Sequence, residues 1–285
     1  MKERYFWVAI GLISISWLAN SLYAYSKQLK EPIFLDHYIE AVIGHHSNVT
    51  FYYLANKNDQ SYINYIVLGD VEGLPQRDFI YPEASPHAVD TYKHQELRSI
   101  TVELRQLNDS DEDRSFNEMQ VYYSDGKAST VSIGEVIIHP SESIASDDPI
   151  PLKLSSGGGS NDGKSSHTFW ATEPLSIQKI SIPFRNALGD ELRLSITGSH
   201  IQKDKTLDGI ELPIHLAEAE HVTVAMQLDQ TAASIPSSFP IHLSGTTAAG
   251  EPFTSNGGYN WQHPYLKQAD VNRIIQEKTG RNSGE

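Results

Sequence analysis

Histidine is the side chain in this sequence best suited to hold a metal ion, and the chain has 12 of them. His45 and His46 are adjacent, but neighbouring side chains on a strand face opposite sides, so both would reach one ion only from a turn. His215 and His221 are six positions apart and could meet across a hairpin. No HExxH motif or compact His/Asp/Glu group accompanies them. We therefore expect scattered surface histidines, with no metal and no cofactor.

One acidic segment imitates the start of a calcium-binding loop. Asp109, Asp111 and Asp113 have the i, i+2, i+4 spacing of the first ligands of an EF-hand. The sixth position of that loop should be glycine and is Arg114, and the twelfth should be glutamate and is Gln120. The segment is therefore predicted to be a solvated acidic loop, with weak cation binding as the alternative.

The sequence contains no motif for nucleophilic catalysis or for phosphate binding. The chain has no GxSxG elbow, and Ser165-Ser166-His167 has no base and orienting group fixed beside it by spacing alone. The glycines at 157–159 lack the lysine and Ser/Thr of a P-loop. With 36 acidic residues, a glycosidase-like carboxylate pair can be judged only by geometry. The sequence therefore assigns no catalytic and no cofactor-binding residue.

Aromatic pairs offer a possible binding surface. Tyr52-Tyr53, Tyr122-Tyr123 and Phe169-Trp170 would each put one ring on either face of a strand, whereas Tyr259 and Trp261 would share a face. Exposed rings of this kind suit sugar or peptide binding. The alternative is that they belong to the core and to partly covered surface.

Charge divides the chain sharply. Residues 1–30 carry a net charge of +3, so the remaining residues carry −17 of a chain whose total is −14. An acidic body argues against nucleic acid as a partner, because phosphate binding needs clustered Lys and Arg. It also argues against a body that lies flat on anionic lipid. The absence of cysteine excludes disulfides and thiol chemistry.

The charge-free stretch Tyr5–Ser26 is 22 residues long, and about 20 helical residues cross a hydrocarbon core about 30 Å thick. Tyr and Trp near both ends suit the interfacial layers. We expect an uncleaved anchor with the N-terminus inside. A signal peptide cut after Ala24, or a buried core helix, is the alternative. The residues expected to span the membrane are Phe6, Trp7, Ile10, Leu12, Ile13, Ile15, Trp17, Leu18 and Leu22.

The rest of the chain is dominated by alternating, β-type patterns. In Arg98–Leu107, Ile100, Val102 and Leu104 alternate with polar residues, as in a half-buried antiparallel strand. Asp125-Gly126 predicts a hairpin turn between two such runs. The rhythm of strands and turns is that of sandwiches or barrels. Further strands are predicted at Asn48–Asn56, Tyr62–Asp70, Glu135–His139, Leu175–Phe184, Glu191–Thr197, Gly209–Leu216, His221–Leu228 and Phe239–Ser244.

These patterns predict a mainly β chain: an N-terminal transmembrane helix, one or two antiparallel Ig-like β-sandwich regions and a short C-terminal helix over Leu266–Lys278. The expected divisions are an anchor with its juxtamembrane segment (1–30), a first sandwich (31–154), a Gly/Ser-rich linker or hairpin loop (155–166), a second sandwich (167–262) and a helix with its tail (263–285).

The combination of a membrane anchor and no cysteine suggests the bacterial cell envelope. We expect a non-enzymatic module, outside the cytoplasm, that binds an envelope protein or glycan through sandwich edges or exposed aromatic rings. The alternatives are a glycosidase-like envelope hydrolase with a dispersed carboxylate site, and a structural or regulatory subunit whose helix contacts a membrane partner. Secretion after signal cleavage would be the alternative localisation.

Overall fold

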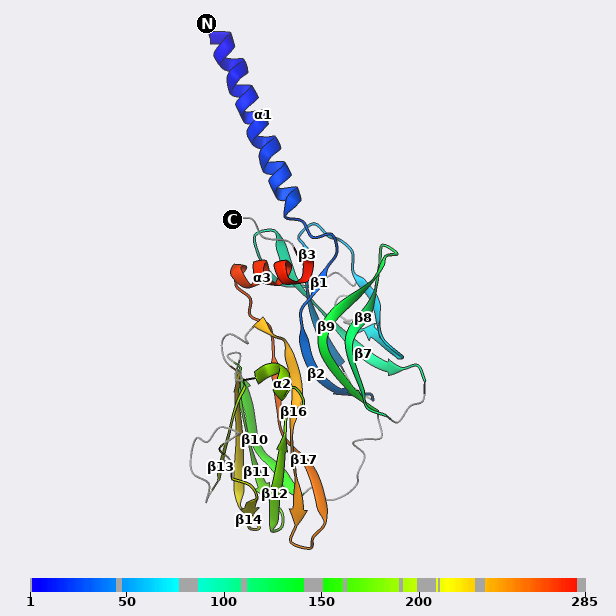
Figure 1. Ribbon diagram of the computed structural model, residues 1–285, viewed down its shortest axis with the longest axis vertical. Coiled ribbons are helices and arrows are strands. Elements are labelled where there is room, and N and C mark those ends of the chain that lie inside the picture. Colours follow the sequence, from blue (N-terminus) through cyan, green and yellow to red (C-terminus); the bar gives the residue numbers. More distant parts are fainter. Residues whose placement is uncertain are drawn as a thin grey trace.

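The structure is a computed structural model in which an isolated helix projects from an elongated β body (Figure 1). It describes residues 2–44, 48–76, 87–108, 112–140, 151–160, 163–189, 192–198, 209, 211–228 and 234–280. The fold class predicted from the sequence is confirmed: the chain is mainly β, with sandwich-like sheets, one N-terminal apolar helix and a short C-terminal helix.

The N-terminal helix α1 (Lys2–Ser26) stands clear of the body (Figure 1). Its Arg4–Ser26 part has a mean hydropathy of 1.4, and none of its residues is buried. The helix ends where Lys27 and Gln28 donate backbone hydrogen bonds to Ala24 and Tyr25, three positions back, which tightens the last turn. By length and composition it is the described helix that could cross a membrane.

The first β region follows the helix and curls around one apolar core, so that β1 comes close to β9. Its strands pair in the order β1-β3-β7-β5-β4-β8-β9-β2, with β6 beside β7. Val102 and Leu104 of β7 are buried in this core, as their alternation predicts. The strands are β1 (Ile33–Phe34), β2 (His37–Val42), β3 (Asn48–Asn56), β4 (Ile63–Leu68), β5 (Val71–Pro75), β6 (His87–Thr91), β7 (Gln95–Gln106), β8 (Arg114–Tyr123) and β9 (Ala128–His139).

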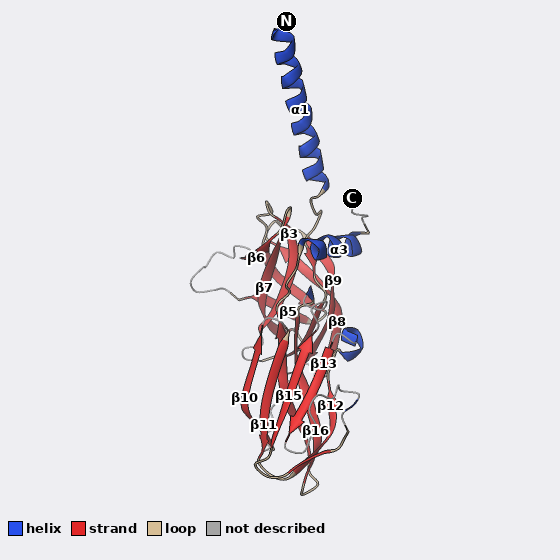
Figure 2. Ribbon diagram, turned by 90° about the vertical axis from the view of Figure 1, so that its left-hand side faces the viewer, coloured by secondary structure: helices blue, strands red, loops and turns tan. Residues whose placement is uncertain are grey.

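The second β region is a sandwich of two sheets with a core between them. One sheet has the order β10-β11-β15-β13, and the facing layer contains β12, β14, β16 and β17 (Figure 1 and Figure 2). A single-turn helix, α2 (Arg185–Leu188), buries Leu188 in the same core. The strands are β10 (Leu152–Ser160), β11 (Lys164–Ala171), β12 (Leu175–Ser181), β13 (Leu192–Gly198), β14 (Ile214–Leu216), β15 (His221–Leu228), β16 (Ser237–Thr247) and β17 (Pro252–Gln262).

Strand β2 connects the two regions. It runs parallel to β9 on one side and parallel to β16 on the other, so the larger sheet continues from the first region into the second. Ile39 of β2 lies in the first core, while the neighbouring Tyr38 packs against the second core and contacts Phe184. The sequence predicted antiparallel pairing only, and these two parallel pairs are the departure from it.

The C-terminal helix α3 (Gln268–Thr279) covers the end of the body nearest α1 (Figure 1). Its first turn is capped by Asp270, whose carboxylate accepts the backbone N–H of Lys267 (2.9 Å), and it ends at Gly280 in the left-handed conformation. Val271 packs with Leu29 and Leu97 in a third apolar cluster. The helix predicted over Leu266–Lys278 is therefore present, starting two residues later.

The Gly/Ser-rich segment 155–166 forms most of a hairpin. Residues 155–160 belong to β10, and residues 164–166 begin β11, with Gly159 opposite Ser165 and Ser160 opposite Lys164. Residues 161 and 162 lie outside the described part of the chain. The division of the body into separate domains stays a prediction.

Candidate functional site

Strand β10 is an exposed sheet edge. Every residue from Lys153 to Ser160 is exposed, on both faces of the strand. Among the described strands β10 pairs only with β11, so its other side presents backbone N–H and C=O groups along the edge. Gly158 has open space where a side chain would stand. An edge of this kind is a template on which another extended chain can pair.

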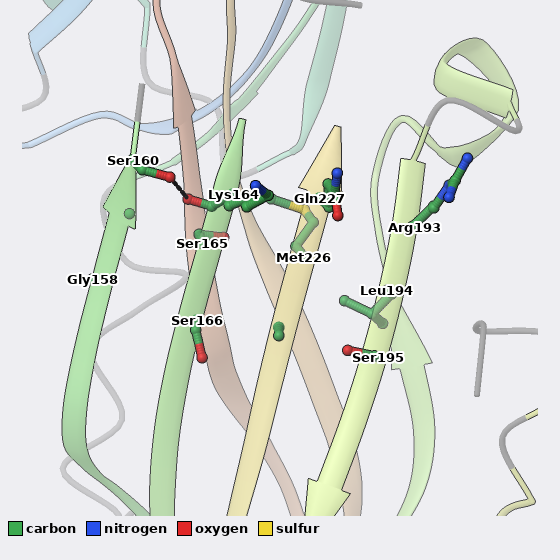
Figure 3. A pocket seen from close by; sticks show the side chains of 12 residues that line it. Gly158, Ser160, Lys164, Ser165, Ser166, Arg193, Leu194, Ser195, Met226 and Gln227 are labelled. Carbon is green, nitrogen blue, oxygen red and sulfur yellow. Dashed lines mark hydrogen bonds between the residues drawn. The ribbon is translucent and has the colours of Figure 1, made fainter. Parts of the chain in front are cut away.

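The outer face of the same sheet has a row of small residues, two of them serines. Gly158, Ser166, Ala225 and Ser195 stand opposite one another in one row across the four strands. They line an open depression of ≈ 680 Å³ at the end of the sheet where the β10–β11 hairpin turns (Figure 3). The depression begins at the exposed edge, so a chain paired to β10 would have room for side chains that reach over the sheet.

His167 holds the hairpin against the facing layer. A Cβ atom on Gly157 of β10 would lie 2.5 Å from Nδ1 of His167, and one on Gly258 of β17 would lie 2.6 Å from its Cδ2. Nε2 of His167 lies 3.3 Å from both the backbone N and the backbone O of Tyr259. The imidazole therefore fills a slot between two glycines. Ser165, which precedes it by two positions, is buried, and Ser165, Ser166 and His167 are consecutive residues of β11, so their side chains alternate between its two faces.

Two of the predicted aromatic residues are exposed on a common face. Tyr259 is 41% exposed and Trp261 is 64% exposed, and they alternate with the buried Asn260 along β17. The Tyr259 hydroxyl lies 2.6 Å from Oγ of Ser238 on β16. Burial raises the pKa of Tyr259, the hydrogen bond to Ser238 opposes that rise and the carboxylate of Glu40 adds to it. In contrast, Tyr52 and Tyr53 are both buried, in different clusters.

A histidine–carboxylate cluster lies where the two β regions meet. Oε1 of the buried Glu40, on β2, is 2.8 Å from Nε2 of His139 on β9 and 2.9 Å from Nε2 of His242 on β16. Nδ1 of His139 lies 2.7 Å from Oδ1 of Asp113. Burial would lower the pKa of His139, but the bond to Asp113 and the charge of Glu40 outweigh it, so the pKa of His139 is raised. His139 therefore holds its proton more tightly than a free imidazole does, at the place where the two regions join.

The arrangement of this cluster suits structural bridging better than hydrolysis. A glycosidase needs the space between its two carboxyl groups for the scissile bond and a water molecule. Here the imidazole of His139 occupies the position between Asp113 and Glu40. Among the described residues, no group of three or more His, Asp or Glu side chains is placed to hold a metal ion. Spacing could not have revealed this cluster, because its members come from distant strands.

The other residues singled out in the sequence are not brought together. His45, His46, Asp109 and Asp111 lie outside the described residues. His215 is on β14 of the larger sheet and His221 is on β15 of the smaller one, so they do not share a hairpin. The residues expected to span a membrane are all exposed along α1: Phe6, Trp7, Ile10, Leu12, Ile13, Ile15, Trp17, Leu18 and Leu22.

Comparison with known proteins gives no family. No protein-family model and no curated protein matches the chain. Among solved structures, it is similar to the D00-D0 domain of intimin (TM-score 0.21, 10% identity, 82% of this chain and 100% of that one). It is also similar to the collagen binding domain of the surface protein RspB of Erysipelothrix rhusiopathiae (TM-score 0.26, 8% identity, 81% and 92%). A third is the CupB2 chaperone of Pseudomonas aeruginosa (TM-score 0.18, 9% identity, 79% and 100%). TM-scores this low carry no argument about function, which therefore rests on the site.

Proposed function

We propose that this chain is a single-pass membrane protein of the bacterial cell envelope whose β body lies outside the cytoplasm. There it binds an extended segment of another envelope protein by strand addition at β10. The observation that carries the proposal is the edge itself, which is exposed from Lys153 to Gly159 and pairs, among the described strands, with β11 on one side. Main-chain hydrogen bonds supply the affinity in this mode of recognition, and pockets beside the added strand supply specificity.

Composition favours the same use of this edge. Natural proteins usually protect edge strands with charge, proline or a covering element. From Ser155 to Ser160 the strand has only serine and glycine, and its one charged residue, Lys153, lies over the ring of Trp170, 5.8 Å from the centroid. The stretch therefore keeps its backbone groups accessible and places little side-chain bulk in the way of a partner.

The anchor supports the placement part of the proposal. All the large apolar residues of α1 are exposed, and water-soluble proteins rarely present so large a contiguous apolar surface. Inserted in a bilayer, the same residues would contact lipid, and the tail before Tyr5 would stay inside. The body would then stand away from the membrane along the line of the helix (Figure 1).

The test uses the full chain in its native membranes with a photo-crosslinking residue at Gly158, where the structure has space for a side chain. We expect one discrete cross-linked protein, and a synthetic peptide matching the cross-linked segment should compete for it. The matched control places the crosslinker at Lys179, which is exposed on β12 of the facing layer. Equal adducts from both positions, or none from Gly158, would reject strand addition at β10.

A further inference from the structure

A basic patch lies where α1 meets the body. Lys27 follows the helix, Lys57 lies in the turn after β3, and Lys93 lies in the turn between β6 and β7. Lys27 and Lys93 both approach the ring of Tyr23, at 5.4 Å and 5.7 Å from its centroid. We call Lys27, Lys57 and Lys93 the juxtamembrane patch.

The effect of these residues on His94 shows that the three positive charges are gathered. Burial is the largest cause that lowers the pKa of His94, and the charges of Lys93, Lys27 and Lys57 follow it in that order. The His94 ring packs edge-on against Tyr23. Lys57 and Lys93 are exposed, and the described carboxylates form no ion pair with any of the three lysines. Three cations without a described ion-pair partner therefore lie around His94, at the end of the helix.

The patch is held in a fixed relation to the helix. The side-chain amide of Asn56, next to Lys57, exchanges two hydrogen bonds with the backbone of Leu29, at 2.9 Å and 2.8 Å. Gln95, two residues after Lys93, donates from Nε2 to the carbonyl of Lys27 at 2.8 Å. These hydrogen bonds tie the turns that carry Lys57 and Lys93 to the chain just after α1, so the three lysines stay beside the end of the helix.

This end of the body also has acidic residues: Asp90 and Asp270 act on Tyr92, next to Lys93, and a second group lies near Tyr123. Glu31, Asp59 and Asp125 act together on Tyr123, whose pKa is raised first by burial and then, against a hydrogen bond from Ser129, by these three charges. The basic patch is thus local, within a body that carries −17 after residue 30. Away from the patch, the body would be repelled by a negative surface.

We infer that the juxtamembrane patch binds the anionic headgroups of the lipids around α1. Tyr23 suits the interfacial layer, and lysines beside an inserted helix are attracted by anionic lipid over about a Debye length. The contact is end-on, so it fixes the tilt of the body without laying its acidic flanks on the membrane. The inference rests on the proposed membrane insertion of α1 and adds the lipid class that the exposed end of the body recognises.

The experiment uses the full chain in vesicles of phosphatidylcholine alone or with phosphatidylglycerol added. Because the chain has no cysteine, Asn58→Cys gives a unique site for a fluorophore beside Lys57, and Ala249→Cys gives one at the far β16–β17 turn. A nitroxide on the lipid headgroups quenches dyes that lie near them. We expect stronger quenching at position 58 in anionic vesicles than in phosphatidylcholine alone. This gain should be lost at 1 M salt, where the Debye length is about 3 Å. The dye at position 249 should not be quenched.

Charge reversal separates the patch from the anchor. Lys57→Glu with Lys93→Glu should abolish the anionic gain at position 58, whereas the matched control Lys153→Glu with Lys179→Glu should keep it. If the patch variant keeps the full gain while the protein still floats with vesicles in carbonate, lipid binding by the patch is wrong and the anchor stands. If the unaltered chain does not float with either vesicle, both the anchor and the lipid contact are wrong.

Discussion

Nε2 of His242 lies 2.9 Å from Oε1 of Glu40, although the two residues are 202 positions apart in the chain. Glu40 belongs to β2, which continues the larger sheet from the first β region into the second, and His242 belongs to β16 of the second region. The same oxygen lies 2.8 Å from His139 of the first region. One buried carboxylate therefore joins imidazoles from both regions. The protonation of this cluster should therefore affect the free energy of unfolding of the body.

Removing the charge of Glu40 should lower the pKa of His139. Burial lowers that pKa, whereas the bond to Asp113 and the charge of Glu40 raise it. Glu40→Gln removes one of the two raising effects, so the pKa should fall. The titration of the His139 Cε1–H resonance by NMR measures the change. Glu118→Gln is the matched control, since it removes a carboxylate that is exposed on β8 and is not among the groups that shift the pKa of His139. Equal His139 titration in the two variants would contradict the prediction.

The sign of the His139 effect on stability follows from its raised pKa. A group that binds its proton more tightly when folded stabilises the fold fully below its unfolded pKa, near 6.5, and loses that contribution as pH rises through the folded pKa. Wild-type protein should therefore lose stability relative to His139→Gln as the pH is raised above about 6.5. Urea unfolding of the full chain in detergent at several pH values measures the difference. A difference that stays constant with pH would exclude proton linkage at His139.

His37 should have the opposite pH dependence. It is fully buried, its Nε2 accepts the backbone N–H of Tyr52 at 2.8 Å, and burial is the main cause that lowers its pKa to about 3. Between that value and the unfolded pKa of 6.5, only the unfolded chain binds the proton, so stability falls as the pH falls. The slope should approach about 1.4 kcal/mol per pH unit.

The test of this prediction compares wild type with His37→Gln between pH 4 and pH 7 by the same urea unfolding. The variant should be less stable at pH 7, because the acceptor for the Tyr52 N–H is disturbed, but the gap should narrow as the pH falls. Subtracting the two curves removes the contribution of the carboxylates that both proteins share. Parallel curves would mean that His37 does not titrate on unfolding.

The glycines of β10 give a prediction with an internal control. Gly157→Ala would place its Cβ atom 2.5 Å from the His167 ring, which cannot retreat because Gly258 lines the other side of the slot. We expect a loss of about 1–3 kcal/mol of unfolding free energy, the usual cost of overpacking. Gly158→Ala meets nothing within 4 Å and should change stability by less than about 0.5 kcal/mol. Thermal unfolding of both variants is the measurement. Equal losses of stability would show that the close fit of His167 between Gly157 and Gly258 does not stabilise the hairpin.

The sequence predicted those parts of the fold that local patterns determine. The apolar run gave α1, the spacing of Leu266, Val271 and Ile274 gave α3, and Asp125-Gly126 gave the β8–β9 hairpin, in which Gly126 has a positive φ of 83°. Each of these signals depends on residues close together in the chain. The shared exposed face of Tyr259 and Trp261 follows from the same two-residue period.

The candidate site was less accessible to prediction, for two physical reasons. Composition favours a flexible loop at 155–166 because serine and glycine bury little apolar surface, yet an edge strand needs only the backbone bonds that β11 supplies. The second reason is distance in the chain. Glu40, His139 and His242 meet only because β2 runs parallel to both β9 and β16, and no local spacing encodes that pairing.

The joint between α1 and the body should depend on Asn56. Its amide satisfies both the N–H and the C=O of Leu29, and Asn56→Ala leaves both groups without these partners in a partly buried position, at a cost of about 1–3 kcal/mol. The helix should then take a wider range of angles to the body. Spin labels at Ala24→Cys and Asn58→Cys, in a chain with no other cysteine, report the distance distribution across the joint.

Asn64→Ala is the control, since the Asn64 amide makes one long bond, of 3.4 Å, to the Tyr123 carbonyl. A distribution that broadens equally in both variants would show that Asn56 does not fix the joint. Broadening in the Asn56 variant alone would identify it as the residue that orients the body on its anchor.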